Sequence, residues 1–151
     1  MSGWRIIGIG QPSAGDDGVG IAVLDHLRAR RLPADVELCE IGDATALIPL
    51  LATERPVLII DALVAAPVGR VHELCLDQLD EHDATRLSSH GLSLVGAIAL
   101  ARTLDPETSA RCIRVFAVTI ARPDRHRQGL SAKVKRAVPV AAQLVLTRLR
   151  A

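Results

Sequence analysis

Aromatic side chains are almost absent from this chain. Its 151 residues include one Trp, one Phe and no Tyr. Proteins that bind single-stranded nucleic acid commonly stack bases on aromatic rings, so that mode of binding is excluded. The formal net charge of +1 provides no bulk attraction to nucleic acid or to an anionic membrane. We therefore expect neither a nucleic acid nor a membrane as a partner.

Cysteine is also scarce, with three residues and no CxxC pair, so neither a zinc ribbon nor a redox motif is indicated. Cys39, Cys75 and Cys112 lie in apolar alternating runs, which predicts buried thiols. No apolar run approaches the ~18 residues of a membrane span, and no charged-then-apolar leader is present. We expect a cytoplasmic protein.

The length of the chain suits one domain, and we expect a single domain over residues 1–151. Strands alternate with helices along it, which predicts a three-layer α/β/α sandwich around a mostly parallel, five-stranded sheet. The expected strands are residues 4–10, 36–41, 57–61, 70–76 and 112–119. The expected helices are residues 17–30, 46–51 and 92–104, the last of these buried nearly all round, and a final helix after residue 131 with Pro139 inside it.

The most informative stretch is residues 6–20, which run from the first strand through a glycine-rich loop into the first helix. Ligands of open α/β sheets bind at the carboxyl ends of the strands, where this loop must lie. A dinucleotide fingerprint would need glycine in place of Ser13, and a phosphate loop would need Lys in place of Asp16. Because Asp16 and Asp17 would repel a phosphate, a nucleotide site is disfavoured.

Three polar residues occupy comparable places between the predicted strands and helices. Asp17 follows the first strand, Asp61 ends the apolar third strand, and His90 lies in a turn before a helix. Two carboxylates and one imidazole suit a divalent ion with coordination positions left open. Alternatively, one of the paired Asp residues caps the first helix, Asp61 is a turn residue, and His90 lies on the surface. The glycines around Asp17 would let a ligand approach closely.

Several motifs resemble one family in the same order along the whole chain, the [NiFe]-hydrogenase maturation endopeptidases. They are GIGQP (8–12), GDDGVG (15–20), IIDA (59–62), SHGLS (89–93) and GLS (129–131). Three departures stand out. Gln11 replaces the usual Asn, Asp17 replaces the Glu of many members, and residues 119–122 replace a Gly followed by an acidic residue.

The resemblance implies an enzyme that trims the C-terminal extension from a nickel-loaded hydrogenase large-subunit precursor. Nickel would be carried by this substrate, with no organic cofactor, and Asp17, Asp61 and His90 would bind it and support catalysis. It also implies a twisted sheet with one antiparallel strand, for which residues 70–76 are the candidate. Asp43, in the GDAT turn (42–45), would contact a basic residue at the scissile site.

The mechanistic hypothesis is metal-guided peptide hydrolysis, with the attacking water activated either by the metal or by a carboxylate. Two rival functions remain at this point. One is a nickel-checking chaperone of the large subunit that performs no catalysis. The other is a small α/β hydrolase of the peptidyl-tRNA type, although the near-neutral charge disfavours a tRNA-binding face. A monomer is the default expectation.

Overall fold

The computed structural model describes residues 3–75, 94–123 and 127–150. Five strands form one sheet: β1 (Arg5–Ile9), β2 (Glu37–Ile41), β3 (Val57–Val64), β4 (Val71–Cys75) and β5 (Ile113–Ile120). The helices are α1 (Val19–Arg28), α2 (Leu47–Leu50), α4 (Leu94–Leu104) and α5 (Ala132–Arg150), with 3-10 turns at η1 (Pro12–Gly18) and η2 (Ala44–Ala46).

The strand order in the sheet is β2-β1-β3-β5-β4. All neighbouring pairs are parallel except β4 and β5, which are antiparallel. The expected mostly parallel sheet is therefore confirmed, as is the antiparallel strand within residues 70–76. β3 and β5 lie inside the sheet and are apolar along nearly their whole length. Strands covered on both faces have this composition because neither set of side chains meets water.

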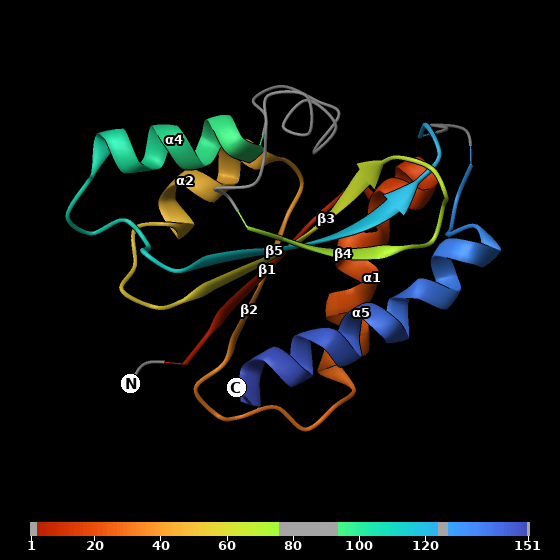
Figure 1. Cartoon of the computed structure of the whole chain (residues 1–151), viewed down its shortest axis with the longest axis horizontal. Helices are drawn as coiled ribbons and strands as arrows, with labels where there is room; N and C mark the ends of the chain where they lie inside the picture. Colours follow the sequence, from red (N-terminus) through yellow and green to blue (C-terminus); the bar gives the residue numbers. More distant parts are fainter. Residues whose placement is uncertain (1–2, 76–93, 124–126, 151) are drawn as a thin grey trace.

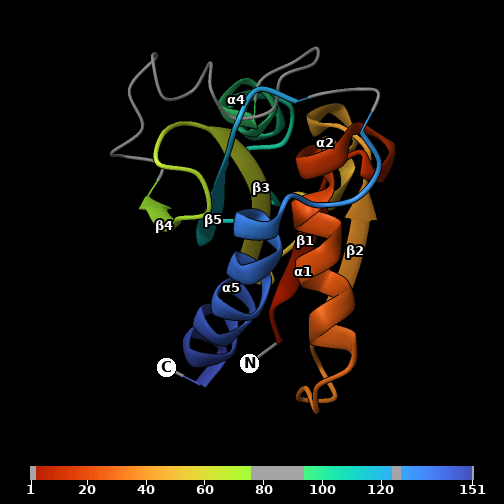
Figure 2. The same cartoon turned by 90° about the vertical axis from the view of Figure 1, so that its right-hand side faces the viewer.

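Helices cover both faces of the sheet, giving the three predicted layers (Figure 1). Apolar side chains of α1 and α5 pack on one face, and those of α2 and α4 pack on the other. Figure 2 shows α1 and α5 side by side. The carboxyl ends of the parallel strands meet at one end of the sheet, at the right in Figure 1, beside the start of α1.

Two predictions about burial are wrong. In α4 only one face is buried, and Leu104 is 66% exposed, because this helix packs on the sheet from one side alone. Cys112 is exposed just before β5, and Cys39 is half-buried. The side chain of Cys75 lies outside the described part of the structure.

α5 continues through Pro139 as one helix. Among the described helices, none has the length and apolarity needed to cross a membrane.

Candidate active site at the carboxyl end of β1

Asp61 lies within β3 rather than at its end. Strand β3 continues to Val64 because it pairs with β5 over its whole length. Gly8 of β1 pairs with Ile60, so Asp61 is level with the last residue of β1. Side chains alternate along a strand, and the neighbours of Asp61 on its own face pack in the cluster under α2 and α4. Asp61 therefore points to that face, at the level where the neighbouring strand β1 ends.

The Asp61 carboxyl group is buried and incompletely satisfied. The residue is 2% exposed. Its Oδ1 accepts a hydrogen bond from the backbone N–H of Ala62 at 2.8 Å, whereas Oδ2 has no hydrogen-bond partner among the described residues. Burial raises the pKa of Asp61 to about 8; the Ala62 N–H opposes this shift, and the charge of Asp17 adds to it. The group is thus protonated at neutral pH unless a cation lies beside it.

Asp17 lies in the η1 turn that follows β1. It is 9% exposed, and its Oδ2 accepts a hydrogen bond from the backbone N–H of Gln11 at 3.2 Å. Its effect on the pKa of Asp61 places the two carboxyl groups within electrostatic reach of each other. The structure thus brings together two of the three predicted ligands. The turn after β1 lies next to the middle of β3 because the two strands are parallel neighbours.

The glycines of this loop pack against the protein itself. A Cβ added at Gly10 would lie 2.4 Å from the carbonyl oxygen of Asp17, and one added at Gly18 would lie 2.7 Å from the Cα of Pro12. The space beside Gly10 and Gly18 is therefore taken by the protein itself and not by a ligand. They let the loop fold tightly on itself, which fixes the position of the Asp17 backbone.

Asp16 does not cap the first helix, although capping by one of the paired Asp residues was the simpler alternative. The N-cap of α1 is Gly18, which has no side-chain capping bond. Asp16 instead accepts two hydrogen bonds from Ser131, from its backbone N–H at 2.6 Å and from its hydroxyl at 2.8 Å. Ser131 immediately precedes α5. The pair therefore ties the start of α5 to the loop that carries Asp17.

Replacing Asp16 with Ala is expected to lower the free energy of unfolding by about 2 kcal/mol, since two hydrogen bonds to a charged group are lost. Replacing Ser131 with Ala should cost about half as much, because the backbone N–H still donates. Urea unfolding of both variants measures these values. Asp25→Ala is the control, since Asp25 is exposed and its carboxylate pairs with the exposed Arg28. If Asp16→Ala lowers the free energy of unfolding no more than Asp25→Ala does, the structural role of the Asp16–Ser131 pair is contradicted.

Gln11 is a residue whose role the sequence does not indicate. Its backbone N–H binds Asp17, and its side-chain Nε2 donates to the carbonyl oxygen of Gly42 at 3.1 Å. Gln11 therefore joins the η1 turn to the turn after β2, which carries Asp43. Asp43 is exposed, and its Oδ1 accepts a hydrogen bond from the backbone N–H of Thr45 at 2.8 Å. The predicted substrate contact thus lies in a turn that is held against the Asp17 loop.

The third predicted ligand, His90, lies outside the described residues. The helix that follows it, α4, packs on the face of the sheet to which Asp61 points. Within residues 3–75, 94–123 and 127–150, no group of three His, Cys, Asp or Glu side chains could hold a metal ion. The described part of the site is therefore a pair of carboxyl groups, one of them with an unpartnered oxygen.

Comparison with known proteins assigns the chain to a family. Residues 21–148 match a family model described as hydrogenase maturation protease (HycI). The chain belongs to the hydrogenase maturation protease family. It is also 30% identical over 138 residues to a protein named FrxA from Pyrococcus furiosus, an alignment that covers 90% of this chain and 97% of the relative.

Solved structures of hydrogenase maturation proteases share the fold. The hydrogenase maturating endopeptidase HybD from Escherichia coli superposes with a TM-score of 0.76 at 22% identity, covering 98% of this chain and 92% of that one. A hydrogenase 2 maturation peptidase from a Thaumarchaeota archaeon gives a TM-score of 0.68 at 28% identity, with 98% of each chain covered. The family thus implies peptidase activity on hydrogenase precursors, carried by the fold described above.

Proposed function

We propose that this protein removes the C-terminal extension of a nickel-loaded [NiFe]-hydrogenase large-subunit precursor, guided by the nickel that the precursor carries. The family supplies the class of reaction and of substrate. The observation that carries the nickel-guided part is the Asp61 Oδ2 atom, which is buried without a hydrogen-bond partner among the described residues. Leaving a buried polar atom unsatisfied is costly. A cation presented by the substrate would satisfy it.

The donor set suits a metal that brings ligands of its own. Asp17 and Asp61 offer carboxylate oxygens, which bind divalent ions, and His90 would add an imidazole nitrogen. Three protein donors do not fill the coordination shell of a divalent ion, so positions remain for ligands from the precursor. This supports nickel as part of the substrate rather than as a resident cofactor.

The raised pKa of Asp61 connects substrate recognition to ionisation. With no cation nearby, burial and the charge of Asp17 hold the pKa of Asp61 at about 8. A cation bound against the carboxyl group favours its ionised form and displaces the proton. The Asp17 and Asp61 carboxylates can then orient the attacking water and accept its proton. Hydrolysis of the peptide bond transfers that proton to the new amine.

We further propose that Asp43 binds a basic side chain near the scissile bond. Asp43 is exposed, so a substrate can reach it, and one of its oxygens is already oriented by the Thr45 N–H. The Gln11 side chain holds the neighbouring Gly42 against the loop of Asp17. A polypeptide whose metal lies at Asp17 and Asp61 would therefore have Asp43 beside it.

The test is incubation of the purified protein with a nickel-loaded large-subunit precursor from the same organism, followed by intact-mass analysis. We expect the precursor to lose one short C-terminal peptide. A stable complex whose mass never changes would support the nickel-checking chaperone instead. Salt-sensitive RNA binding without any processing would favour the peptidyl-tRNA type of hydrolase.

A further inference from the structure

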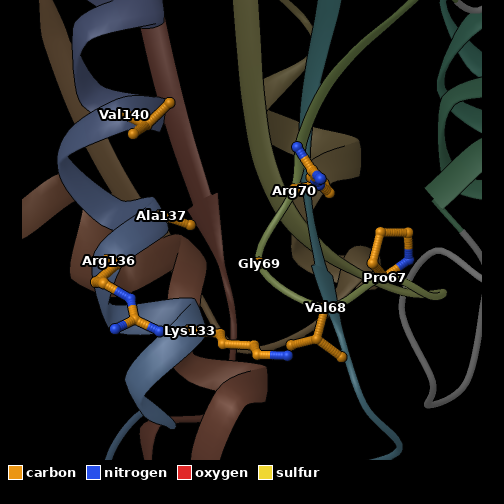
Figure 3. Close-up of a pocket in the computed structure, with 8 residues that line it drawn as sticks. All are labelled: Pro67, Val68, Gly69, Arg70, Lys133, Arg136, Ala137 and Val140. Atoms are coloured by element: carbon orange, nitrogen blue, oxygen red, sulfur yellow. The ribbon is translucent and has the colours of Figure 1, made fainter.

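A groove of about 410 Å³ lies between the β3–β4 connection and the first half of α5. Residues 67–70 form one wall, and Lys133, Arg136, Ala137 and Val140 of α5 form the other (Figure 3). In this view the Lys133 side chain extends from α5 toward Val68. The candidate active site includes none of these residues.

The wall formed by residues 67–70 is held rigidly by Thr119 of β5. The Thr119 hydroxyl donates to the carbonyl oxygen of Pro67 at 2.7 Å and accepts from the backbone N–H of Arg70 at 2.8 Å. Gly69 has a φ of +86°, and a Cβ there would lie 2.9 Å from the carbonyl oxygen of Lys133. The two walls are therefore in contact at the base, and the groove is preformed.

The groove is cationic. Arg70, Lys133 and Arg136 are exposed, and the structure gives them no ion pair with any residue that it describes. None of the residues lining the groove is acidic. Lys133 and Arg136 also lie near the N-terminus of α5, where the helix dipole disfavours cations. The helix dipole therefore does not stabilise these charges, which favours a role in binding.

An apolar ridge continues the groove along α5. Val140 lines the groove and is 53% exposed, and Leu144, one turn further on, is 40% exposed. A ligand that follows this surface would meet positive charge first and apolar side chains next. Inorganic phosphate or a nucleic acid backbone would satisfy the cations but would leave the apolar ridge uncovered.

Both walls begin at elements of the candidate active site. β3 carries Asp61 and leads into residues 67–70. Lys133 follows Ser131 by two residues, and Ser131 is hydrogen-bonded to Asp16, the neighbour of Asp17. A folded polypeptide bound at Asp17 and Asp61 is large enough to reach the groove as well.

We propose that this groove is a docking site for an acidic segment of the polypeptide substrate, one that also carries an apolar side chain to cover Val140 and Leu144. The inference rests on the proposed function for the identity of the partner. Complementary charge would speed and orient the encounter, while the scissile bond is held separately at the two carboxyl groups.

The test measures binding of a fluorescently labelled peptide in which Glu alternates with Leu, by anisotropy at physiological ionic strength. Lys133→Glu is compared with Lys135→Glu, which makes the same charge change two residues away on an exposed position outside the groove. Both variants are expected to fold with at least wild-type thermal stability, because a carboxylate near the start of a helix is favourable.

We expect the wild-type protein to bind the peptide, Lys133→Glu to weaken binding about fivefold or more, and Lys135→Glu to change it less than twofold. With the precursor at low concentration, we expect the rate of processing to fall more in Lys133→Glu than in Lys135→Glu. Equal effects of the two variants, or absence of peptide binding, would overturn the proposal, as would saturation of the groove by inorganic phosphate alone or by anionic vesicles. Peptide binding without any processing would count against the proposed function and not against the docking site.

Discussion

Replacing Asp61 with Asn is expected to abolish processing of the nickel-loaded precursor, lowering the rate by about a thousandfold or more. Asn has nearly the same size and can still accept the Ala62 N–H, but it offers no negative charge to a cation and accepts no proton. The fold should be unaffected. The rate is measured from the intact mass of the precursor over time, and wild-type processing by Asp61→Asn would refute the role of this carboxyl group.

The same variant should change the pH dependence of stability. In the folded protein the pKa of Asp61 is about 8, whereas an unfolded Asp titrates near pH 4. Between these values the folded state holds one more proton than the unfolded state. The contribution of Asp61 to the free energy of unfolding therefore falls with rising pH, by at most about 1.4 kcal/mol per pH unit, and levels off above pH ~8.

Because Asn does not titrate, Asp61→Asn should lose this dependence and become more stable than the wild type at alkaline pH. Urea unfolding between about pH 5 and pH 9 gives the difference between the two proteins at each pH. Asp25→Asn is the matched control, since it makes the same chemical change at an exposed position. Parallel curves for wild type and Asp61→Asn would contradict a raised pKa at this position.

Replacing Gly20 with Ala is expected to destabilise the protein strongly, costing about 3 kcal/mol. Gly20 lies where α1 crosses β1 and β3. A Cβ there would lie 2.4 Å from the carbonyl oxygen of Ile9 and 2.6 Å from that of Ile60. Both atoms belong to the backbone of central strands and cannot move aside without shifting the sheet. Since Ile60 immediately precedes Asp61, processing should also fall.

Gly129→Ala is the control for the Gly20 substitution. Gly129 has a φ of +82°, which Ala disfavours, but within the described part of the chain no atom beyond its two sequence neighbours lies within 4 Å of the position of its Cβ. We expect a cost of about 1 kcal/mol from the backbone conformation alone. Chemical denaturation of both variants gives the comparison. If Gly20→Ala lowers the free energy of unfolding no more than Gly129→Ala does, the prediction is contradicted, because α1 can then move away from the sheet to make room for the Cβ.

The sheet and its layers could be predicted from the sequence because strand composition and helical periodicity are local signals. The apolar run of residues 57–60 indicated a central strand, and the carboxyl group that directly follows this run made Asp61 a candidate site residue. The extension of β3 to Val64 could not be predicted in the same way, since it depends on pairing with β5 far along the chain. The exposure of Leu104 likewise depends on how α4 lies on the sheet.

Long-range contacts account for most of what the sequence did not reveal about the site. Asp16 and Ser131 are 115 residues apart, and nothing local to either one predicts their hydrogen bonds. The contact between Gln11 and Gly42 spans 31 residues. The packing of Gly10 against Asp17 was also inaccessible, because a glycine-rich loop has the same sequence whether it makes room for a ligand or packs on itself.

The most direct test of the account divides one preparation of large-subunit precursor into nickel-free and nickel-loaded halves and incubates each with the wild-type protein. Intact mass is then read for both. The account predicts loss of the C-terminal peptide from the nickel-loaded half alone, because it assigns to the metal the partner that Asp61 Oδ2 lacks among the described residues. Equal cleavage of both halves would contradict recognition through the nickel.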